Sequence, residues 1–88
     1  IEDARAIEKA GAFCMVIEGV IAEVASEVAS CVEIPVIGIG AGNGVDGQVL
    51  VFSDMLGLFE EFTPKFVKKY LNGAEIIKTK IKEYSDEV

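Results

Sequence analysis

The sequence predicts an α/β fold built on a parallel sheet, and three observations support this class. Two short, wholly apolar runs, residues 12–17 and 34–39, have the length and composition of strands buried on both faces. A stretch with helical spacing of its apolar residues, from 21 to about 32, separates them. Strands that alternate with helices form βαβ units, whose reactive groups lie beyond the carboxyl ends of the strands.

Length and composition limit what the chain can be. Its 88 residues make at most one small domain, yet 51% of them are hydrophobic and the mean hydropathy is +0.42. A body of this size buries only a modest core. The apolar content therefore indicates a piece of a larger barrel or sheet, or a chain that depends on a partner. No apolar run is long enough for a membrane span, and the acidic Glu2-Asp3 does not fit a signal peptide.

Charge and cysteine usage argue against several classes of function. The net charge of −7 disfavours nucleic acid as a general partner. The lysines of residues 64–88 favour a solvated basic face over an anion-binding patch. Cys14 and Cys31 lie in apolar stretches without CxxC spacing, which indicates buried free thiols in a reducing compartment such as the cytoplasm. Without histidine or a third cysteine, a zinc site is not expected.

The first half of the chain is expected to begin with an amphipathic helix over residues 1–10, which Gly11 ends. The strand over 12–17 follows and runs into Glu18-Gly19. A carboxylate directly after a buried strand is costly unless it has a partner or a role. Glu18 is therefore the first candidate functional residue. The next helix, over residues 21–32, carries small alanines on its inner face, which permits close packing against a sheet.

The second strand leads into a glycine-rich loop over residues 38–48, which also holds Asp46. Glycine lets the backbone turn at positive φ or approach another group closely. Two interpretations arise, a phosphate cradle and a tight turn of a barrel strand. The loop lacks the Lys-Ser/Thr of a P-loop and the GxGxxG spacing, which favours the turn. Asp46 is expected to anchor this turn or to cap a helix.

The second half is less regular. Residues 48–52 form a third apolar run, expected to be a short strand or a helix, and Ser53-Asp54 follow it at the same edge as Glu18. Asp54 is expected to be structural rather than to line a site. Residues 55–59 are apolar and irregular, so they should pack under a neighbour.

Two helices are expected at the end of the chain. Thr63-Pro64 is a helix-start signal, with Thr63 as the N-cap, for a helix over residues 65–71 that Asn72-Gly73 ends. A last helix is expected from residue 74 to about 87.

Glu18 is the candidate acid or base of the chain. Its apolar neighbours are expected to raise its pKa by desolvation, which suits proton transfer near neutral pH. The alternative is a carboxylate that caps the following helix or pairs with a cation, and the residues leave both interpretations open. A Ser-His-Asp arrangement is excluded because the chain has no histidine.

Several segments, taken in order, carry a family resemblance: AGAF at residues 10–13, VIE at 16–18, IPVIGIGAGN at 34–43, DGQVLV at 46–51, DMLGL at 54–58 and FTPKFVK at 62–68. Together they resemble the C-terminal part of the ketopantoate hydroxymethyltransferase (3-methyl-2-oxobutanoate hydroxymethyltransferase) family. The resemblance covers essentially the whole chain, and the segment from 34 to 48 is the most specific part of it.

The resemblance implies a (β/α)8 barrel of the phosphoenolpyruvate mutase/isocitrate lyase type, of which residues 1–88 would be one partial domain of about three βα units and terminal helices. It implies that a hydroxymethyl group passes from 5,10-methylenetetrahydrofolate to 3-methyl-2-oxobutanoate, giving 2-dehydropantoate in pantothenate biosynthesis. It assigns the catalytic acid/base to Glu18. It also implies Mg²⁺ with ligands upstream of these residues, so the 88 residues alone are expected to be inactive.

The resemblance further implies a homo-oligomer, a decamer of two pentameric rings, with the helices of residues 64–88 in subunit contacts. Three residues depart from the family's usual pattern: Gly19 replaces Cys, Ile21 replaces Pro and Ser53 replaces His. A second hypothesis, of a different class, is a non-catalytic barrel remnant or assembly module, in which the helices of residues 64–88 mediate oligomer contacts and Glu18 is structural. A stand-alone flavodoxin-like phosphate binder is a third, against which the missing P-loop and Rossmann patterns count.

Overall fold

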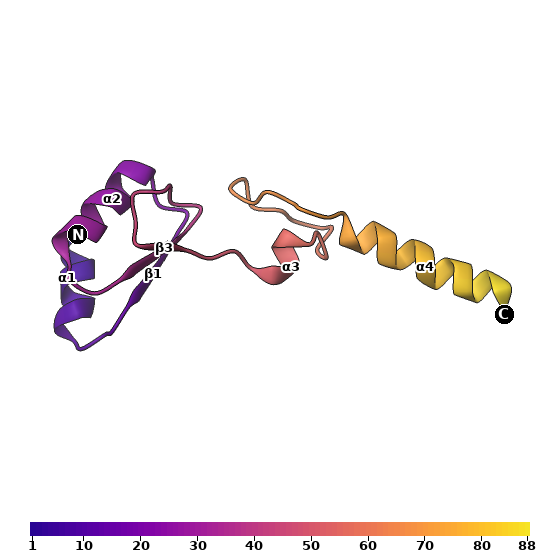
Figure 1. The fold of residues 1–88 in the computed structure, drawn as a ribbon, viewed down its shortest axis with the longest axis horizontal. Coiled ribbons are helices and arrows are strands. Elements are labelled where there is room, and N and C mark those ends of the chain that lie inside the picture. Colours follow the sequence, from indigo (N-terminus) through magenta and orange to yellow (C-terminus); the bar gives the residue numbers. More distant parts are fainter. The chain divides into compact units, whose positions relative to one another are not determined.

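A computed structural model describes all 88 residues, which divide into two compact units, Ile1–Val49 and Leu50–Val88. The first unit contains α1 (Glu2–Lys9), β1 (Met15–Glu18), α2 (Ala22–Cys31), β2 (Val36–Ile39) and β3 (Gly47–Gln48) (Figure 1). The second contains α3 (Phe52–Met55) and α4 (Gly73–Glu87). No helix of either unit combines the length and the apolar character that crossing a membrane requires.

The first unit confirms the predicted α/β class with a parallel sheet. Its three strands are parallel and lie in the order β1-β2-β3. β1 pairs with β2 from Met15 opposite Val36 to Glu18 opposite Ile39, and α2 makes the crossover between these two strands. β3 joins the other edge of β2, where Gly47 lies opposite Ile37. The connection from β2 to β3 contains no helix and is shorter than the crossovers that usually join parallel neighbouring strands.

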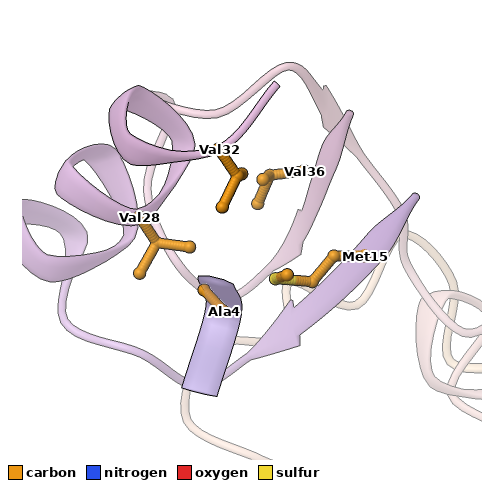
Figure 2. Packing of buried hydrophobic residues seen from close by; sticks show 5 residues of the cluster. All are labelled: Ala4, Met15, Val28, Val32 and Val36. Carbon is orange, nitrogen blue, oxygen red and sulfur yellow. The ribbon is translucent and has the colours of Figure 1, made fainter. Parts of the chain in front are cut away.

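The core of the first unit lies between the two helices and one face of the sheet. Met15 and Val36, which are opposite each other on β1 and β2, are both buried. Figure 2 shows them packed with Ala4 of α1 and, from α2 and its C-terminal end, with Val28 and Val32. The helices α1 and α2 therefore cover one face of the sheet.

The helix α1 confirms the first predicted helix and also makes a contact that the sequence did not predict. Its residue Glu8 accepts two backbone hydrogen bonds through Oε1, from the amide of Glu33 at 2.6 Å and from that of Ile34 at 3.2 Å. These bonds satisfy the backbone just before β2, a carboxylate being a strong acceptor of amide hydrogens. They fix the start of β2 against the first helix.

Both long strands are shorter than the apolar runs that predicted them. β1 begins at Met15 rather than at residue 12, and β2 begins at Val36 rather than at 34. Pro35 has no amide hydrogen to give to a ladder, and the amide of Ile34 is taken by Glu8. The carbonyl of Pro35 still accepts the amide hydrogen of Met15 at 2.9 Å, which starts the pairing.

The part of the chain after the glycine loop departs from the sequence prediction. Residues 48–52 are not one element, because β3 ends at Gln48 and α3 begins at Phe52. The helix predicted over residues 65–71 is wrong. The segment makes a turn, in which the Val67 amide donates to the Pro64 carbonyl at 3.0 Å, and the Tyr70 amide donates to the carbonyl of Met55 at 2.8 Å. Short helices are marginal by themselves, and the bond to Met55 gives this backbone a different partner.

The helix α4 confirms the last predicted helix, but Asn72-Gly73 begins it instead of ending an earlier one. Asn72 is its N-cap residue, and the Nδ2 group donates to the carboxylate of Glu75 at 2.6 Å. The amide of Gly73 donates to the carbonyl of Leu56 at 2.8 Å, and the amide of Ala74 donates to that of Gly57 at 3.0 Å. These bonds tie the first turn of α4 to the residues that follow α3.

Candidate active site

The carboxyl edge of the parallel sheet brings Glu18 and the glycine loop together. Glu18 is the last residue of β1 and lies opposite Ile39, the last residue of β2. Beyond them the amide of Gly19 donates to the carbonyl of Ile39 at 2.9 Å, so the two chain segments remain joined where the strands end. The loop starts at Gly40. The prediction that Glu18 and this loop share one edge is confirmed.

Glu18 belongs to the face of the sheet that α1 and α2 leave uncovered. Met15 is buried and Ile17 packs against the core on the helix side. Side chains alternate along a strand, so Val16 and Glu18 point to the opposite face. Val16 is 60% exposed, and Glu18 is exposed as well. The expected cover of apolar neighbours over Glu18 is therefore wrong within these 88 residues, because the nearest apolar residues on its own strand lie on the other face or in solvent.

The two structural roles considered for Glu18 do not occur in the structure. The N-cap of α2 is Ile21, and no side chain makes a capping hydrogen bond there. The three ion pairs all lie in the second unit and join Lys78 to Glu60, Lys80 to Glu83 and Lys82 to Asp86. The carboxylate of Glu18 therefore neither caps α2 nor pairs with a cation.

The loop over residues 40–46 lies tightly against α2. Gly42 has φ +80°, and a Cβ atom built there would lie 2.5 Å from the Cβ atom of Ala22. One helical turn further on, a Cβ atom at Gly44 would lie 2.8 Å from the Cβ atom of Ser26. Both separations are closer than carbon atoms can pack. The glycines therefore let the loop run along the helix, which agrees with the interpretation as a tight turn.

Two polar side chains fasten the loop to the sheet. The Asp46 carboxylate accepts the amide hydrogen of Val36 at 2.8 Å, and its own amide donates to the Val36 carbonyl at 2.9 Å. Asp46 thus anchors the turn, the first of its two predicted roles. The Nε2 group of Gln48 donates to the carbonyl of Gly42 at 2.8 Å. The sequence did not predict this role of Gln48. The one sign of it in the sequence is an amide side chain directly after Asp46-Gly47.

An Asp46→Ala variant is expected to destabilise the first unit by about 1–3 kcal/mol, because the amide of the buried Val36 loses its charged acceptor. Asp46→Asn keeps a side-chain carbonyl oxygen and should lose less. Hydrogen exchange of the β2 amides measures the change. Equal protection in Asp46→Ala and the parent would show that the anchor is dispensable.

The structure does not support the third strand end that was expected beside Glu18. Ser53 and Asp54 lie inside α3, in the second unit, and no strand precedes them directly. Their backbone carbonyls accept the amide hydrogens of Leu58 at 2.9 Å and of Gly57 at 3.2 Å. The two residues thus help to close the turn after α3 through their main chain.

The chain's own residues do not make a metal site. No three of its carboxylates and thiols gather where they could hold a metal ion. Mg²⁺ requires a near-octahedral set of oxygen ligands, so the residues present do not fit this ion by themselves. Cys14 and Cys31 are free thiols, but each is half-buried rather than fully buried as expected.

The predicted solvated basic face agrees with the ion pairs of the second unit. Lys78, Lys80 and Lys82 each pair with a carboxylate, and their side chains remain 69–76% exposed. Exposed pairs of this kind add little stability. The charges of α4 therefore serve mainly to keep one side of the helix in water.

Comparison with known proteins gives a consistent set of matches. The sequence model of a family described as "Ketopantoate hydroxymethyltransferase" matches residues 1–88. A protein of Sulfurimonas denitrificans named 3-methyl-2-oxobutanoate hydroxymethyltransferase is 77% identical to the chain over 88 residues. Proteins of the same name from Nitratiruptor sp. and Wolinella succinogenes are 60% identical over the same length. Each match covers 100% of this chain and 34% of the relative, so the chain spans about a third of these relatives' length and corresponds to their C-terminal part.

Proposed function

Because the chain belongs to the ketopantoate hydroxymethyltransferase family, we propose that it is the C-terminal third of a transferase that makes 2-dehydropantoate. The acceptor is 3-methyl-2-oxobutanoate, the keto acid in the relatives' name. The carbon of the hydroxymethyl group comes from 5,10-methylenetetrahydrofolate and its oxygen from water, with release of tetrahydrofolate, and the reaction belongs to pantothenate biosynthesis. We assign the enzyme to the cytoplasm, where the free thiols Cys14 and Cys31 stay reduced.

The proposed architecture is a (β/α)8 barrel of the phosphoenolpyruvate mutase/isocitrate lyase type. In such a barrel the helices cover the outside, and the other face of each strand lines the interior. The arrangement of α1 and α2 on one face of the sheet supports this assignment. The uncovered face of β1, which carries Val16 and Glu18, then lines the barrel interior. Both units would be parts of this one domain.

The position of Glu18 is the single observation that carries the functional proposal. It is the last residue of β1, on the face without helices, and active sites of these barrels lie at the carboxyl ends of their strands. Transfer to the keto acid requires removal of the proton at C3, and the carbon nucleophile so formed attacks the one-carbon unit. A carboxylate is suited to accept that proton. Glu18 is therefore the proposed acid/base.

A Mg²⁺ ion in a complete enzyme would hold the keto acid and offset negative charge on its oxygen. Its ligands would come from residues outside this chain, because no group of carboxylates here is arranged for it. The contribution of this chain is the base, Glu18, and the loop of residues 40–46 beside it.

A second role is proposed for residues 64–88, in subunit contacts of a homo-oligomer, by resemblance a decamer. The supporting observation is an apolar stripe on α4 that is 47–71% exposed and consists of Ile76, Ile77, Ile81 and Tyr84. Apolar residues at helical spacing normally pack against another element. If assembly were the only role of the chain, as in a non-catalytic remnant, Glu18 would be dispensable.

A chimera tests the functional proposal. The 88 residues replace the matching part of the Sulfurimonas denitrificans protein, to which they are 77% identical. Formation of 2-dehydropantoate from the keto acid and 5,10-methylenetetrahydrofolate is followed by chromatography, with the 88 residues alone as the control. We expect turnover by the chimera and none by the control. A folded chimera without turnover would contradict the proposal, and would implicate Gly19, Ile21 or Ser53.

A further inference from the structure

The Gln48 side chain bonds to the loop that starts beside Glu18. We propose that Gln48 is a positioning residue, which holds the first half of this loop in place and thereby sets the rate of hydroxymethyl transfer. This inference rests on the proposed function and on the assignment of Glu18 as the base. Gln48 acts through the backbone of Gly42.

The pairing of β2 with β3 determines where Gln48 can reach. Gln48 lies opposite Gly38, and its Nε2 atom would be 3.9 Å from a Cβ atom built on that glycine. The side-chain amide of Gln48 therefore lies over Gly38. It then meets the carbonyl of Gly42 at 2.8 Å, within the usual range for an N–H···O hydrogen bond.

The bond to Gly42 is the only hydrogen bond that fixes the middle of the loop. Between Ile39 and Asp46 the backbone makes no other hydrogen bond, either to main chain or to a side chain. Gly40, Gly42 and Gly44 alternate through this segment and give it a wide conformational range. Packing against α2 limits the loop on one side. The bond from Gln48 supplies the restraint that packing alone does not.

The hydrogen bond from Gln48 to Gly42 lies close in sequence to the backbone next to Glu18. The carbonyl of Ile39 accepts the amide hydrogen of Gly19, so the residue after Glu18 is joined to the residue before the loop. Ile39 lies three residues before Gly42, so a loop freed at Gly42 can pull on this junction. Displacements of about 1 Å remote from the chemistry can lower rates by up to roughly a hundredfold. Gln48 is thus placed to influence turnover while leaving the core unchanged.

Three substitutions at Gln48 in the chimera test this inference. Gln48→Met keeps the length and removes the donor, Gln48→Glu places a carboxylate against the Gly42 carbonyl, and Gln48→Lys keeps a donor. We expect kcat to fall roughly tenfold to a hundredfold in the first two variants, with a smaller change in KM for the keto acid, and to recover in the third. Hydrogen exchange in residues 40–46 should accelerate with Met and Glu, while the melting temperature stays at that of the parent.

Ser30→Ala is the matched control. Its hydroxyl donates to the carbonyl of Ser26 at 2.9 Å, an exposed side-chain-to-backbone bond of the same kind on α2. This variant should keep the parent's kcat. Losses in Gln48→Met that equal those in Ser30→Ala would overturn the inference.

Two further outcomes separate this inference from the proposed function. If Glu18→Gln abolishes transfer and Gln48→Met keeps the parent's kcat, the role of Gln48 is overturned while the function stands. If Glu18→Gln leaves transfer intact, the assignment of Glu18 fails and the inference that depends on it fails too. A fall in kcat with unchanged exchange in the loop would also overturn it, since the loop is the only route proposed.

Discussion

A Glu18→Gln variant of the chimera is expected to lose hydroxymethyl transfer by roughly 10²–10⁴-fold, the usual contribution of a general acid or base. The amide has nearly the shape of the carboxylate but cannot accept the C3 proton of the keto acid. Since Glu18 is exposed and makes no ion pair or helix cap in the structure, its replacement should leave the fold unchanged. Initial rates and thermal melting measure the two effects separately.

A partial reaction sharpens this test. Exchange of the C3 hydrogen of the keto acid with deuterated water, followed by NMR without the folate, reports on proton removal alone. It should fall in parallel with transfer in Glu18→Gln. Glu27→Gln, at an exposed carboxylate on α2, is the matched control and should exchange at the parent's rate. Full activity in Glu18→Gln would favour the non-catalytic remnant, and lost transfer with normal exchange would move Glu18 to a later step.

The place of Glu18 at a strand end was predictable from local sequence, whereas its surroundings were not. An apolar run followed by a carboxylate defines the end of a buried strand, and β1 ends on that residue. The expected desolvation assumed that sequence neighbours surround the side chain. In a strand they alternate between faces, so Ile17 packs on the helix side and Val16 lies in solvent beside Glu18. Only strands outside these residues could cover that face.

The glycine loop shows a similar division. Its glycines and Asp46 indicated a tight, anchored turn, because these residue types form turns by their own backbone chemistry. The bond from Gln48 to Gly42 was not predictable, since it depends on the register of β3 against β2. β3 pairs with β2 over only two residues, which is too few for a hydrophobic pattern that would predict their register.

The absence of the helix predicted over residues 65–71 shows that helix-start and helix-stop residues alone do not predict a helix. Thr63-Pro64 is favourable at a helix start. Such a signal does not, however, provide an element against which the apolar residues of the helix could pack. Phe66 and Val67 have modest helix propensity, and the Tyr70 amide finds the carbonyl of Met55 across the turn. In α4, by contrast, the apolar spacing continues for the whole length of the helix, and the prediction is confirmed.

Gly42→Ala is expected to be the most destabilising single-methyl change in the first unit, by roughly 2–5 kcal/mol. About 1–2 kcal/mol arises from an L-residue in the left-handed region, since φ is +80°. A further 1–3 kcal/mol, roughly, arises from overpacking, because the new methyl group would lie 2.5 Å from the Cβ atom of Ala22. Hydrogen exchange of the β1 and β2 amides in the chimera measures the loss.

The chain supplies a control that separates strain from overpacking. Gly11 also has a positive φ, +98°, but a Cβ atom built there meets nothing within 4 Å. Gly11→Ala should therefore show the strain alone, roughly 1–2 kcal/mol. Adding Ala22→Gly to Gly42→Ala removes the contact with the Cβ atom and leaves the Cα atom of residue 22 at 3.2 Å. It should therefore restore part of the loss, which a double-mutant cycle measures as a coupling between the two positions. Equal losses in Gly11→Ala and Gly42→Ala, with no coupling to Ala22, would mean that the loop does not need to lie against α2.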